Sequence, residues 1–398
     1  MTSFRTIDDL DVNGKRVVLR ADLNVPVADG KVSDATRIDR AADTIRVLLD
    51  KGAAVLVLSH FGRPKGKVVP EMSLKPVVSA LSEALGRPVR LVETDWTDGA
   101  AQTAADGAAP GDVLLFENTR FHPGDEANDD GLAETLAGLG DVFVNDAFSA
   151  AHRAHASTVG IAHHLPAAAG LTMAAEIEAL EKALSSPERP VIAIVGGAKV
   201  STKIDLLANL VEKVDELVIG GGMANTFLAA QGHPVGNSLC ERDKLDTALE
   251  IEAAARAANC ELVLPTDVIA AKAFEANAPH RVCGLDEVAD DEMILDIGPA
   301  TEADLEARLS KARTVLWNGP FGAFELAPFD AGTNAVARAA ARLTKAGRLL
   351  SVAGGGDTVA ALNKAGVTDD FTFVSTAGGA FLEWLEGKAL PGVEVLRK

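Results

Sequence analysis

Cysteine and aromatic side chains are scarce in this chain. Its 398 residues include three cysteines (Cys240, Cys260 and Cys283), no tyrosine and only 4% aromatic residues. Three cysteines are too few for a disulfide framework, and their spacing matches no zinc motif. We therefore expect small buried thiols in a reducing compartment, which is typical of a cytoplasmic protein.

Long apolar runs and an excess of positive charge are also missing. No stretch approaches the ~20 apolar residues that span a bilayer, and the first residues, MTSFRTIDDL, lack the apolar core of a signal peptide. We expect no membrane partner and a cytoplasmic location. The net charge of −19 argues against binding to nucleic acid or to anionic lipid.

Two common phosphate-binding motifs do not occur either. GxxxxGK[ST] is absent throughout, and no GxGxxG follows the first expected strand. The first absence excludes a P-loop. The second disfavours a dinucleotide-dependent oxidoreductase.

What the chain does contain is a regular alternation of short apolar runs and longer helical patterns, which is typical of βα units and parallel sheets. Strands are expected at residues 16–23, 53–58, 113–116, 142–144, 191–195, 216–219, 261–264, 314–317, 348–352 and 371–374. Helices are expected at residues 38–49, 74–85, 131–139, 199–214, 244–258, 303–312, 333–346 and 358–364.

The middle of the chain indicates two domains. In residues 171–184, Met173, Ile177, Leu180 and Leu184 form one apolar stripe before prolines break the pattern, which predicts a connecting helix. We place an N-terminal domain at 1–170 and a C-terminal domain at 171–388. The tail at 389–398 is too short to form a domain and is expected to pack back on the first one.

Polar side chains follow nearly every expected strand of the first half, and ligands of open parallel sheets bind at that edge. Arg20, Asp22 and Asn24 follow the first strand. A single arginine at such a place is most often a surface ion pair. The repeated pattern instead predicts a cationic pocket, because arginine forks match phosphate and carboxylate oxygens. Its members would be Arg37, His60, Arg63, Arg120 and Arg153.

Strands of the second half end in glycines, which suits backbone binding of phosphates. The stretch VIAIVGGAKVSTKI predicts a strand, a glycine turn and a helix that carries Lys199 and Lys203 on one face of its first turn. In GGGDT, Asp357 is either a helix N-cap or a magnesium ligand, and Gly366 is expected to cap the C-terminus of that helix.

An anion pocket on one domain and a nucleotide cradle on the other suggest group transfer across a cleft. Two other classes stay open at this point: a dinucleotide-dependent oxidoreductase, and a binding protein that captures a phosphorylated metabolite without catalysis. The missing GxGxxG weighs against the first. The two lysines and Asp357 weigh against the second.

Ten separated motifs resemble the phosphoglycerate kinase family, in its order and over essentially the whole chain. They are RADLNVP, SHFGRPKG, ENTRF, DAFSAAHRAHAST, GGAKVSTKI, IGGGMANTFL, DIGPAT, WNGPFGAFE, GGGDT and LEGKALPGVEVL. The resemblance implies two Rossmann-like, three-layer α/β/α domains with mostly parallel sheets, joined by a connecting helix around a central cleft.

The resemblance also implies the reaction. A monomer would transfer the 1-phosphoryl group of 1,3-bisphosphoglycerate to Mg-ADP reversibly, giving 3-phosphoglycerate and ATP, by direct in-line transfer with hinge closure. The acceptor in the reverse direction is a carboxylate, which is ionised near neutral pH and needs no general base.

Site residues follow from the same resemblance. The first domain would hold 3-phosphoglycerate through Asp22, Asn24, Arg37, His60, Arg63, Arg120 and Arg153. Catalytic charge would come from Arg37, Lys199 and Lys203. The nucleotide would meet Lys203, Gly221, Gly222, Gly298, Asn318, Glu325, Gly355, Gly356, Asp357 and Thr358, with Asp357 as the metal ligand. The chain departs from the family pattern at Ala377, Phe381 and Trp384, where Gly, Ser and a smaller apolar residue are expected.

Overall fold

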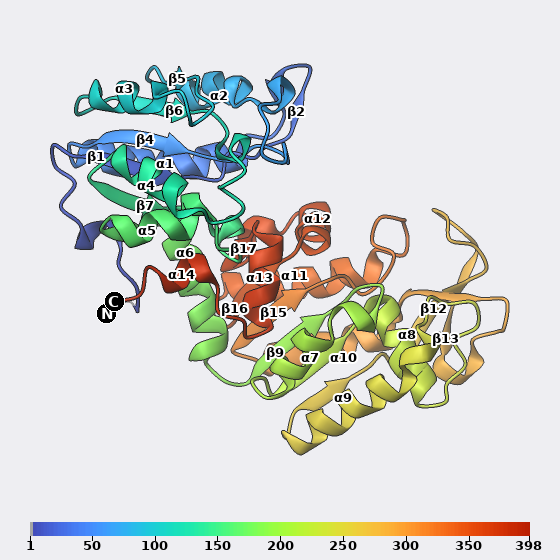
Figure 1. Ribbon diagram of the computed structural model, residues 1–398. Helices are drawn as coiled ribbons and strands as arrows, with labels where there is room; N and C mark the ends of the chain where they lie inside the picture. The colour runs from blue at the N-terminus through green and yellow to red at the C-terminus, as the bar shows by residue number, and fades with distance from the viewer. Residues whose placement is uncertain (1–2) are drawn as a thin grey trace. The chain divides into compact units, whose positions relative to one another are not determined.

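The chain forms two compact units in the computed structural model, which describes residues 3–398 (Figure 1). The first unit runs to Glu178 and includes Ala389–Lys398, and the second comprises Ala179–Lys388. The boundary falls inside helix α6 (Leu171–Leu180), whereas the predicted boundary between 170 and 171 lies just before that helix.

The first unit is built on a parallel sheet of six strands in the order β5-β6-β4-β1-β7-β8. Its strands are β1 (Arg16–Arg20), β4 (Ala54–Leu58), β5 (Arg90–Val92), β6 (Val113–Phe116), β7 (Val142–Asn145) and β8 (Ala167–Ala169). A small hairpin of β2 (Val27–Ala28) and β3 (Lys31–Val32) follows β1. Chain order reverses at β1, because β4 and β6 lie on one side of it and β7 and β8 on the other.

Helices cover this sheet, so its strands read as continuous apolar runs. The α-helices are α1 (Thr36–Asp50), α2 (Lys75–Leu85), α3 (Ala100–Asp106), α4 (Asp130–Gly138) and α5 (Ile161–His164). Short helical turns lie at η1 (Ile7–Asp9), η2 (Pro70–Met72), η3 (Thr119–Phe121), η4 (Phe148–Ala150) and η5 (Ala156–Gly160). Alternate strand residues such as Val17 and Leu19 pack against Ile38 and Ile45 of α1. Because successive side chains of a strand point to opposite faces of the sheet, every second residue of these strands faces α1 and α2.

The last ten residues complete the first unit. Helix α14 (Pro391–Glu394) lies there, and Leu390, Val393 and Leu396 are buried. The amide of Arg5 donates to the carbonyl oxygen of Leu396 at 2.9 Å, which ties the start of the chain to its end.

The second unit has its own six-stranded parallel sheet, in the order β11-β10-β9-β15-β16-β17. Its strands are β9 (Val191–Val195), β10 (Glu216–Ile219), β11 (Glu261–Val263), β15 (Thr314–Asn318), β16 (Leu350–Gly354) and β17 (Phe373–Ser375). Chain order reverses between β9 and β15. A second, antiparallel sheet contains β12 (Asp267–Ala271), β13 (His280–Gly284) and β14 (Met293–Ile297).

Helices on both faces of the main sheet make this unit three-layered (Figure 1). They are α7 (Ile204–Val211), α8 (Gly221–Ala230), α9 (Leu245–Ala257), α10 (Pro299–Lys311), α11 (Ala331–Lys345), α12 (Gly356–Ala365) and α13 (Gly378–Leu385). Short turns are η6 (Glu181–Ser185), η7 (Val200–Thr202), η8 (Arg242–Lys244), η9 (Leu285–Glu287) and η10 (Thr368–Asp370). One core joins Ile192 and Trp317 of the sheet to Leu305 of α10 and Val336 of α11.

The predicted fold class, two α/β units with mostly parallel sheets, is confirmed. The antiparallel sheet was not expected, because the sequence of β13 is short and polar and its first residues are exposed. Strand β8 was also missed. It consists of three alanines, which carry no β-branched signal.

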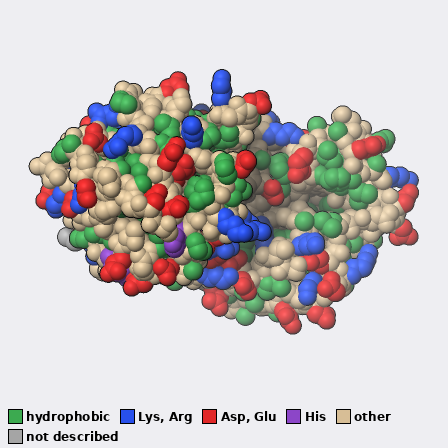
Figure 2. All heavy atoms as spheres, turned by 45° about the horizontal axis from the view of Figure 1, so that its top comes forward, with side chains coloured by type: hydrophobic (Ala, Val, Ile, Leu, Met, Phe, Trp, Pro, Cys, Tyr) green, Lys and Arg blue, Asp and Glu red, His purple; other side chains and the backbone are tan. Residues whose placement is uncertain are grey.

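Charged side chains of both signs cover the surface. Asp and Glu are spread over the face shown in Figure 2, with Lys and Arg among them, as the net charge of −19 requires. Among residues 3–398, no helix has the length and apolar character needed to cross a bilayer.

Candidate active site

The carboxyl ends of β1 and β7 lie where the strand order of the first unit reverses, which is where open α/β sheets bind ligands. The predicted residues Asp22 and Asn24 follow β1 directly, and helix α1 supplies Arg37. The guanidinium of Arg37 forms an ion pair with Asp22 at 3.1 Å and donates to the carbonyl oxygen of Asn24 at 2.9 Å. The structure therefore brings these three predicted residues together.

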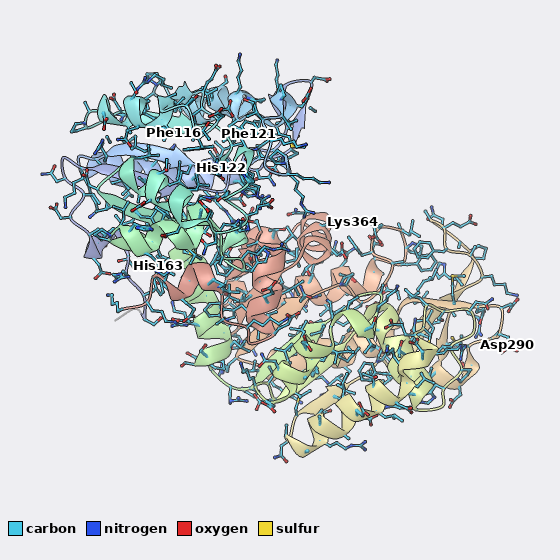
Figure 3. All side chains as sticks on the ribbon, in the orientation of Figure 1. Phe116, Phe121, His122, His163, Asp290 and Lys364 are labelled. Atoms are coloured by element: carbon cyan, nitrogen blue, oxygen red, sulfur yellow. The ribbon has the colours of Figure 1, made fainter. Side chains whose placement is uncertain are left out.

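The loop after β4 joins this group. The amide of Gly62 donates to Oδ1 of Asn24 at 2.9 Å, and the carbonyl oxygen of Gly62 accepts a hydrogen bond from Arg120 at 3.1 Å. Arg120 lies on the turn η3 after β6, and Figure 3 labels Phe116, Phe121 and His122 from the same stretch of the chain. One backbone segment thus connects the ends of three neighbouring strands.

Three guanidinium groups interact electrostatically at this edge. Burial lowers the pKa of Arg120, Glu126 and Asp125 oppose that shift, and the positive charges of Arg63 and Arg153 add to it. Arg63 and Arg153 are exposed, so both are open to a ligand. Such a concentration of positive charge is typical of an anion site.

Two histidines lie beside the arginines. His60 and His155 are both buried, and burial is the main cause that lowers the pKa of each below the usual value. The Nδ1 atom of His155 is buried without a hydrogen-bond partner within residues 3–398. An unpartnered buried polar atom at this edge is consistent with a bound ligand or water.

In the second unit the reversal point lies between the ends of β9 and β15, and Lys203 lies over it. Its ammonium donates to the carbonyl oxygen of Gly196 and to Oδ1 of Asn318, both at 2.6 Å. Burial lowers the pKa of Lys203 to about 8, while the negative charge of Asp357 opposes that shift. Lys203 therefore contacts Asn318 and lies near Asp357.

The prediction that Lys199 and Lys203 share the first turn of one helix is wrong. Lys199 has extended backbone, η7 follows it, and α7 begins only at Ile204. The hydroxyl of Ser201 donates to Glu241, and that of Thr202 donates to the carbonyl oxygen of Lys199. Such side-chain bonds compete with regular helix. Burial raises the carboxyl pKa of Glu241, but the hydrogen bonds from Ser201 outweigh it and lower that pKa, and the positive charge of Lys199 adds to the lowering.

A cavity of about 480 Å³ opens beside this reversal point, within the range of small-molecule sites. Four predicted residues line it: Gly221, Gly222, Glu325 and Asp357. Its walls are mainly apolar, and they include six side chains that were not among the predicted site residues: Ala198, Leu239, Phe274, Met293, Phe321 and Phe324. Leu239 and Phe274 lie outside every quoted motif, because residues on irregular loops carry no periodic signal. Parts of the wall do fall within the quoted motifs GGAKVSTKI, IGGGMANTFL, DIGPAT and WNGPFGAFE.

Contacts of Lys364 hold the loop that carries Glu325 in place. Lys364, in the last turn of α12 and labelled in Figure 3, donates to the carbonyl oxygen of Phe324 at 2.8 Å and pairs with Asp330 at 3.0 Å. Asp296 lines the cavity and accepts from the amide of Gly332 at 2.8 Å. Burial raises the pKa of Asp296 to about 8.

A second hollow of about 270 Å³ lies next to the start of α12 and is lined by the predicted Gly355 and Gly356, among others. The N-cap of α12 is Gly355, so the alternative that Asp357 acts as an N-cap is wrong. Asp357 is exposed in the first helical turn. Gly366 does cap the C-terminus of α12 in the left-handed conformation, as predicted.

Four predicted nucleotide residues line neither hollow, and Lys203, described above, is one of them. Asn318 is buried and donates to the carbonyl oxygen of Gly354 at 2.7 Å, and Thr358 accepts from the amide of Gly319 at 2.7 Å. Gly298 lies against Asp267, whose carboxylate accepts from the amides of Ala300 and Thr301 at the start of α10. Neither Asn318, Thr358 nor Gly298 lines the cavities.

The departures near the C-terminus are accommodated locally. The amide of Ala377 donates to Ser375 at 3.2 Å, and Ala377 precedes α13 with a negative φ of −102°, so glycine is not required there. Phe381 is fully buried against Gly354. Trp384 lies on the same helix and is partly buried.

The sequence model of the phosphoglycerate kinase family matches residues 7–388. The chain belongs to the phosphoglycerate kinase family. A phosphoglycerate kinase of Methylobacterium radiotolerans is 63% identical over 398 residues, which cover 100% of this chain and 99% of that protein. One of Rhodospirillum centenum is 62% identical over 394 residues, or 99% of each chain.

Solved structures agree with this assignment. Phosphoglycerate kinase from Coxiella burnetii has a TM-score of 0.92 and 46% identity, and the match covers 99% of this chain and 98% of that one. The Pyrococcus horikoshii enzyme has a TM-score of 0.81 and 31% identity, with 98% of each chain covered.

As a member of this family, the chain is a nucleotide-binding transferase of glycolysis with a carboxyl acceptor. It catalyses reversible phosphoryl transfer between 1,3-bisphosphoglycerate and ADP. The family assignment rules out the two alternatives that the sequence left open, an oxidoreductase and a non-catalytic binding protein.

Proposed function

We propose that the two units divide the substrates between them, with 3-phosphoglycerate on the first unit and the nucleotide on the second. The observation that carries this proposal is the chemistry at the two strand-order reversals. Guanidinium groups gather at one, and glycine turns, a lysine and an apolar cavity gather at the other.

On the first unit, Arg63, Arg120 and Arg153 would bind the phosphate of 3-phosphoglycerate, because forked guanidinium groups match its oxygens. Arg37 would meet the reacting carboxyl end. Its contacts with Asp22 and Asn24 support this role, since they orient the guanidinium before substrate arrives. The remaining members of the substrate set are His60, Asp22 and Asn24.

On the second unit, the apolar cavity would hold the nucleoside. Gly221 and Gly222 allow its close approach, and the carboxylate of Glu325 is suited to accept hydrogen bonds from ribose hydroxyls. The phosphates would extend toward Gly355, Gly356 and the first turn of α12, where free backbone amides favour anions. Asn318, Thr358 and Gly298 would not touch the nucleotide directly but would support the loops that form this surface.

Magnesium would accompany the nucleotide, with Asp357 as its protein ligand. Asp357 is an exposed carboxylate near Lys203, and Mg²⁺ takes one or two carboxylates together with phosphate oxygens. Residues 3–398 contain no group of three or more His, Cys, Asp or Glu side chains placed to hold a metal, so Asp357 would share the ion with the nucleotide. The ion would neutralise part of the phosphate charge.

Catalysis would consist of positioning and charge neutralisation. The carboxylate acceptor is already ionised, so no residue has to remove a proton. Arg37, Lys199 and Lys203 would stabilise the negative charge on the transferring group, which moves in line between the two substrates. Direct transfer requires the bound substrates to meet, and we propose α6 as the hinge element. We also propose a cytoplasmic monomer.

One assay tests this proposal. The purified protein is given 3-phosphoglycerate, ATP and Mg²⁺, and ADP formation is followed through a coupled reaction. Activity should fall with Arg63→Ala and with Asp357→Ala, and only the first variant should raise the KM for 3-phosphoglycerate strongly. Equal effects of both variants on both KM values would overturn the division of substrates.

A further inference from the structure

Arg20 lies at this edge with a guanidinium that no ligand can reach. It ends β1, directly before the predicted substrate residues, yet its relative exposure is 0%. A buried guanidinium is costly unless its donors are satisfied and its charge is compensated. The contacts that satisfy it therefore indicate what it does.

All three nitrogens of the Arg20 guanidinium have partners. Nε donates to the hydroxyl of Ser157 at 3.1 Å and Nη1 to the carbonyl oxygen of Ala21 at 2.6 Å. Nη2 lies 3.0 Å from Nδ1 of His60. Because guanidinium groups donate and never accept, Nδ1 of His60 must be the acceptor in this contact. The proton of a neutral His60 ring is then on Nε2.

A buried carboxylate compensates the charge of Arg20. Asp125 is fully buried, accepts from Thr119 at 2.6 Å and from the amide of Ser157 at 3.0 Å, and interacts electrostatically with Arg20. Ser157 thus contacts both members of the pair. The network spans β1, the loop after β6 and η5, so tertiary structure holds the guanidinium in one place.

The surroundings of His60 favour its neutral form. Burial and the positive charges of Arg20 and Arg120 lower its pKa well below the usual value, His155 adds to that effect, and Asp125 opposes it. His60 therefore adds no positive charge to the pocket near neutral pH. His60 contributes a directional donor.

We infer that Arg20 is a positioning residue that fixes His60 as the Nε2–H tautomer, so that His60 offers substrate a neutral hydrogen-bond donor. The inference deepens the proposed function, because it rests on His60 belonging to the 3-phosphoglycerate site. Arg20 itself touches no substrate.

The first test is spectroscopic and needs no substrate. Protein labelled with ¹⁵N at histidine is studied by NMR, and the side-chain signals of His60 are assigned by their loss in His60→Gln. The expected result is a neutral ring protonated at Nε2 from pH 6 to pH 8. A ring protonated at Nδ1, or an imidazolium at pH 7, would overturn the inference whether or not the proposed function holds.

The second test asks whether Arg20 acts through His60. Arg20→Lys keeps a buried positive charge but loses the fork that reaches Nδ1, and it should raise the KM for 3-phosphoglycerate about tenfold while leaving the KM for ATP unchanged. A glutamine side chain donates through its amide without a choice of tautomer. The same Arg20→Lys change should therefore have little effect in a His60→Gln background.

Two controls keep this test decisive. Arg20→Met with Asp125→Asn removes both buried charges together, so it avoids an unpaired carboxylate if Arg20→Lys does not fold. A rise in KM that is equal in the wild-type and His60→Gln backgrounds would show a purely structural role and overturn the inference. An Nε2–H ring together with unchanged KM values in His60→Ala would instead overturn the substrate role of His60.

Discussion

At the scale of single residues, the surroundings of Lys203 set its charge. Burial lowers the pKa of its ammonium to about 8, so the free enzyme loses this charge as pH rises through about 8. Since kcat/KM reports the free enzyme, kcat/KM for ATP should fall above pH 8. The arginine side chain of Lys203→Arg does not titrate in this range. This variant should therefore be less active, but its kcat/KM for ATP should not fall above pH 8.

Asp296 provides the control for that profile, because its pKa is also about 8 and it lines the proposed nucleoside cavity. Asp296→Asn should retain the fall in kcat/KM if Lys203 causes it. A fall that disappears in Asp296→Asn and persists in Lys203→Arg would assign it to the carboxyl group instead.

A second prediction concerns the positive charges proposed to act in catalysis. Lys203→Ala and Arg37→Ala should each lower kcat by about 100-fold or more, in line with the loss of one donor to the transition state. Circular dichroism should show an intact fold. The exposed Lys311 and Arg90 supply matched controls, and Lys311→Ala and Arg90→Ala should retain full kcat. A near-normal kcat in Lys203→Ala or Arg37→Ala would remove that residue from catalysis.

At the scale of elements, the turn after β15 depends on a close backbone approach. Gly319 has a φ of +112°, and a Cβ there would lie 2.1 Å from the carbonyl oxygen of Gly196. Gly319→Ala should therefore destabilise the second unit by about 3 kcal/mol and raise the KM for ATP.

Gly347 serves as a control that separates the cost of a positive φ from the cost of the close contact with Gly196. Its φ of +65° is also positive, but a Cβ there would meet nothing within 4 Å. Gly347→Ala should cost only about 1 kcal/mol and leave the KM unchanged. Urea denaturation and steady-state kinetics measure both quantities, and equal losses in the two variants would contradict the role of the Gly196 contact.

The start of α6 depends on a buried carboxylate. Asp146 accepts from Thr44 at 2.6 Å and from the amide of Met173 at 3.0 Å, and burial raises its pKa to about 6. The folded-state pKa lies above the usual 3.8. The contribution of Asp146 to the free energy of unfolding is therefore fully present below about pH 4 and is lost as pH rises through about 6.

Asp146→Asn should remove this pH dependence. The free energy of unfolding of the wild type, relative to Asp146→Asn, should fall by about 3 kcal/mol between pH 4 and pH 7, which corresponds to about two pK units. Urea denaturation across this range measures the difference. A constant difference would show that Asp146 does not titrate as stated.

Much of the fold was predictable because parallel strands buried on both faces are continuous apolar runs. Val113–Phe116 and Val191–Val195 were predicted with the bounds that the structure gives. The start of α7 was not predictable, because it depends on Glu241, which lies 40 residues from Ser201 in the chain. The cavity wall at Phe274 likewise comes from a loop whose position only tertiary structure sets.

The site was predictable to a similar degree. Arginines and glycines that directly follow strands were found, because the ends of parallel strands meet at one sheet edge. The exact contacts were not, since they depend on side-chain direction. Thr358 and Asn318 bind backbone groups of neighbouring loops, and Arg20 is directed into the interior.

At the scale of the whole molecule, the C-terminal tail belongs to the first unit. Leu396 is fully buried there. Leu396→Ala should destabilise that unit by about 3 kcal/mol, the usual cost of such a cavity. Hydrogen exchange followed by mass spectrometry should show faster exchange in peptides of the first unit. Peptides from 179–388 serve as the internal control, and equal acceleration in both units would contradict the assignment of the tail.

The pairing of the two chain ends also has a consequence for biosynthesis. Phe4 bridges Arg397, and the amide of Lys398 donates to the carbonyl oxygen of Ser3. Because residues 389–398 are synthesised after 179–388, the first unit to be started is completed only once the second has been made.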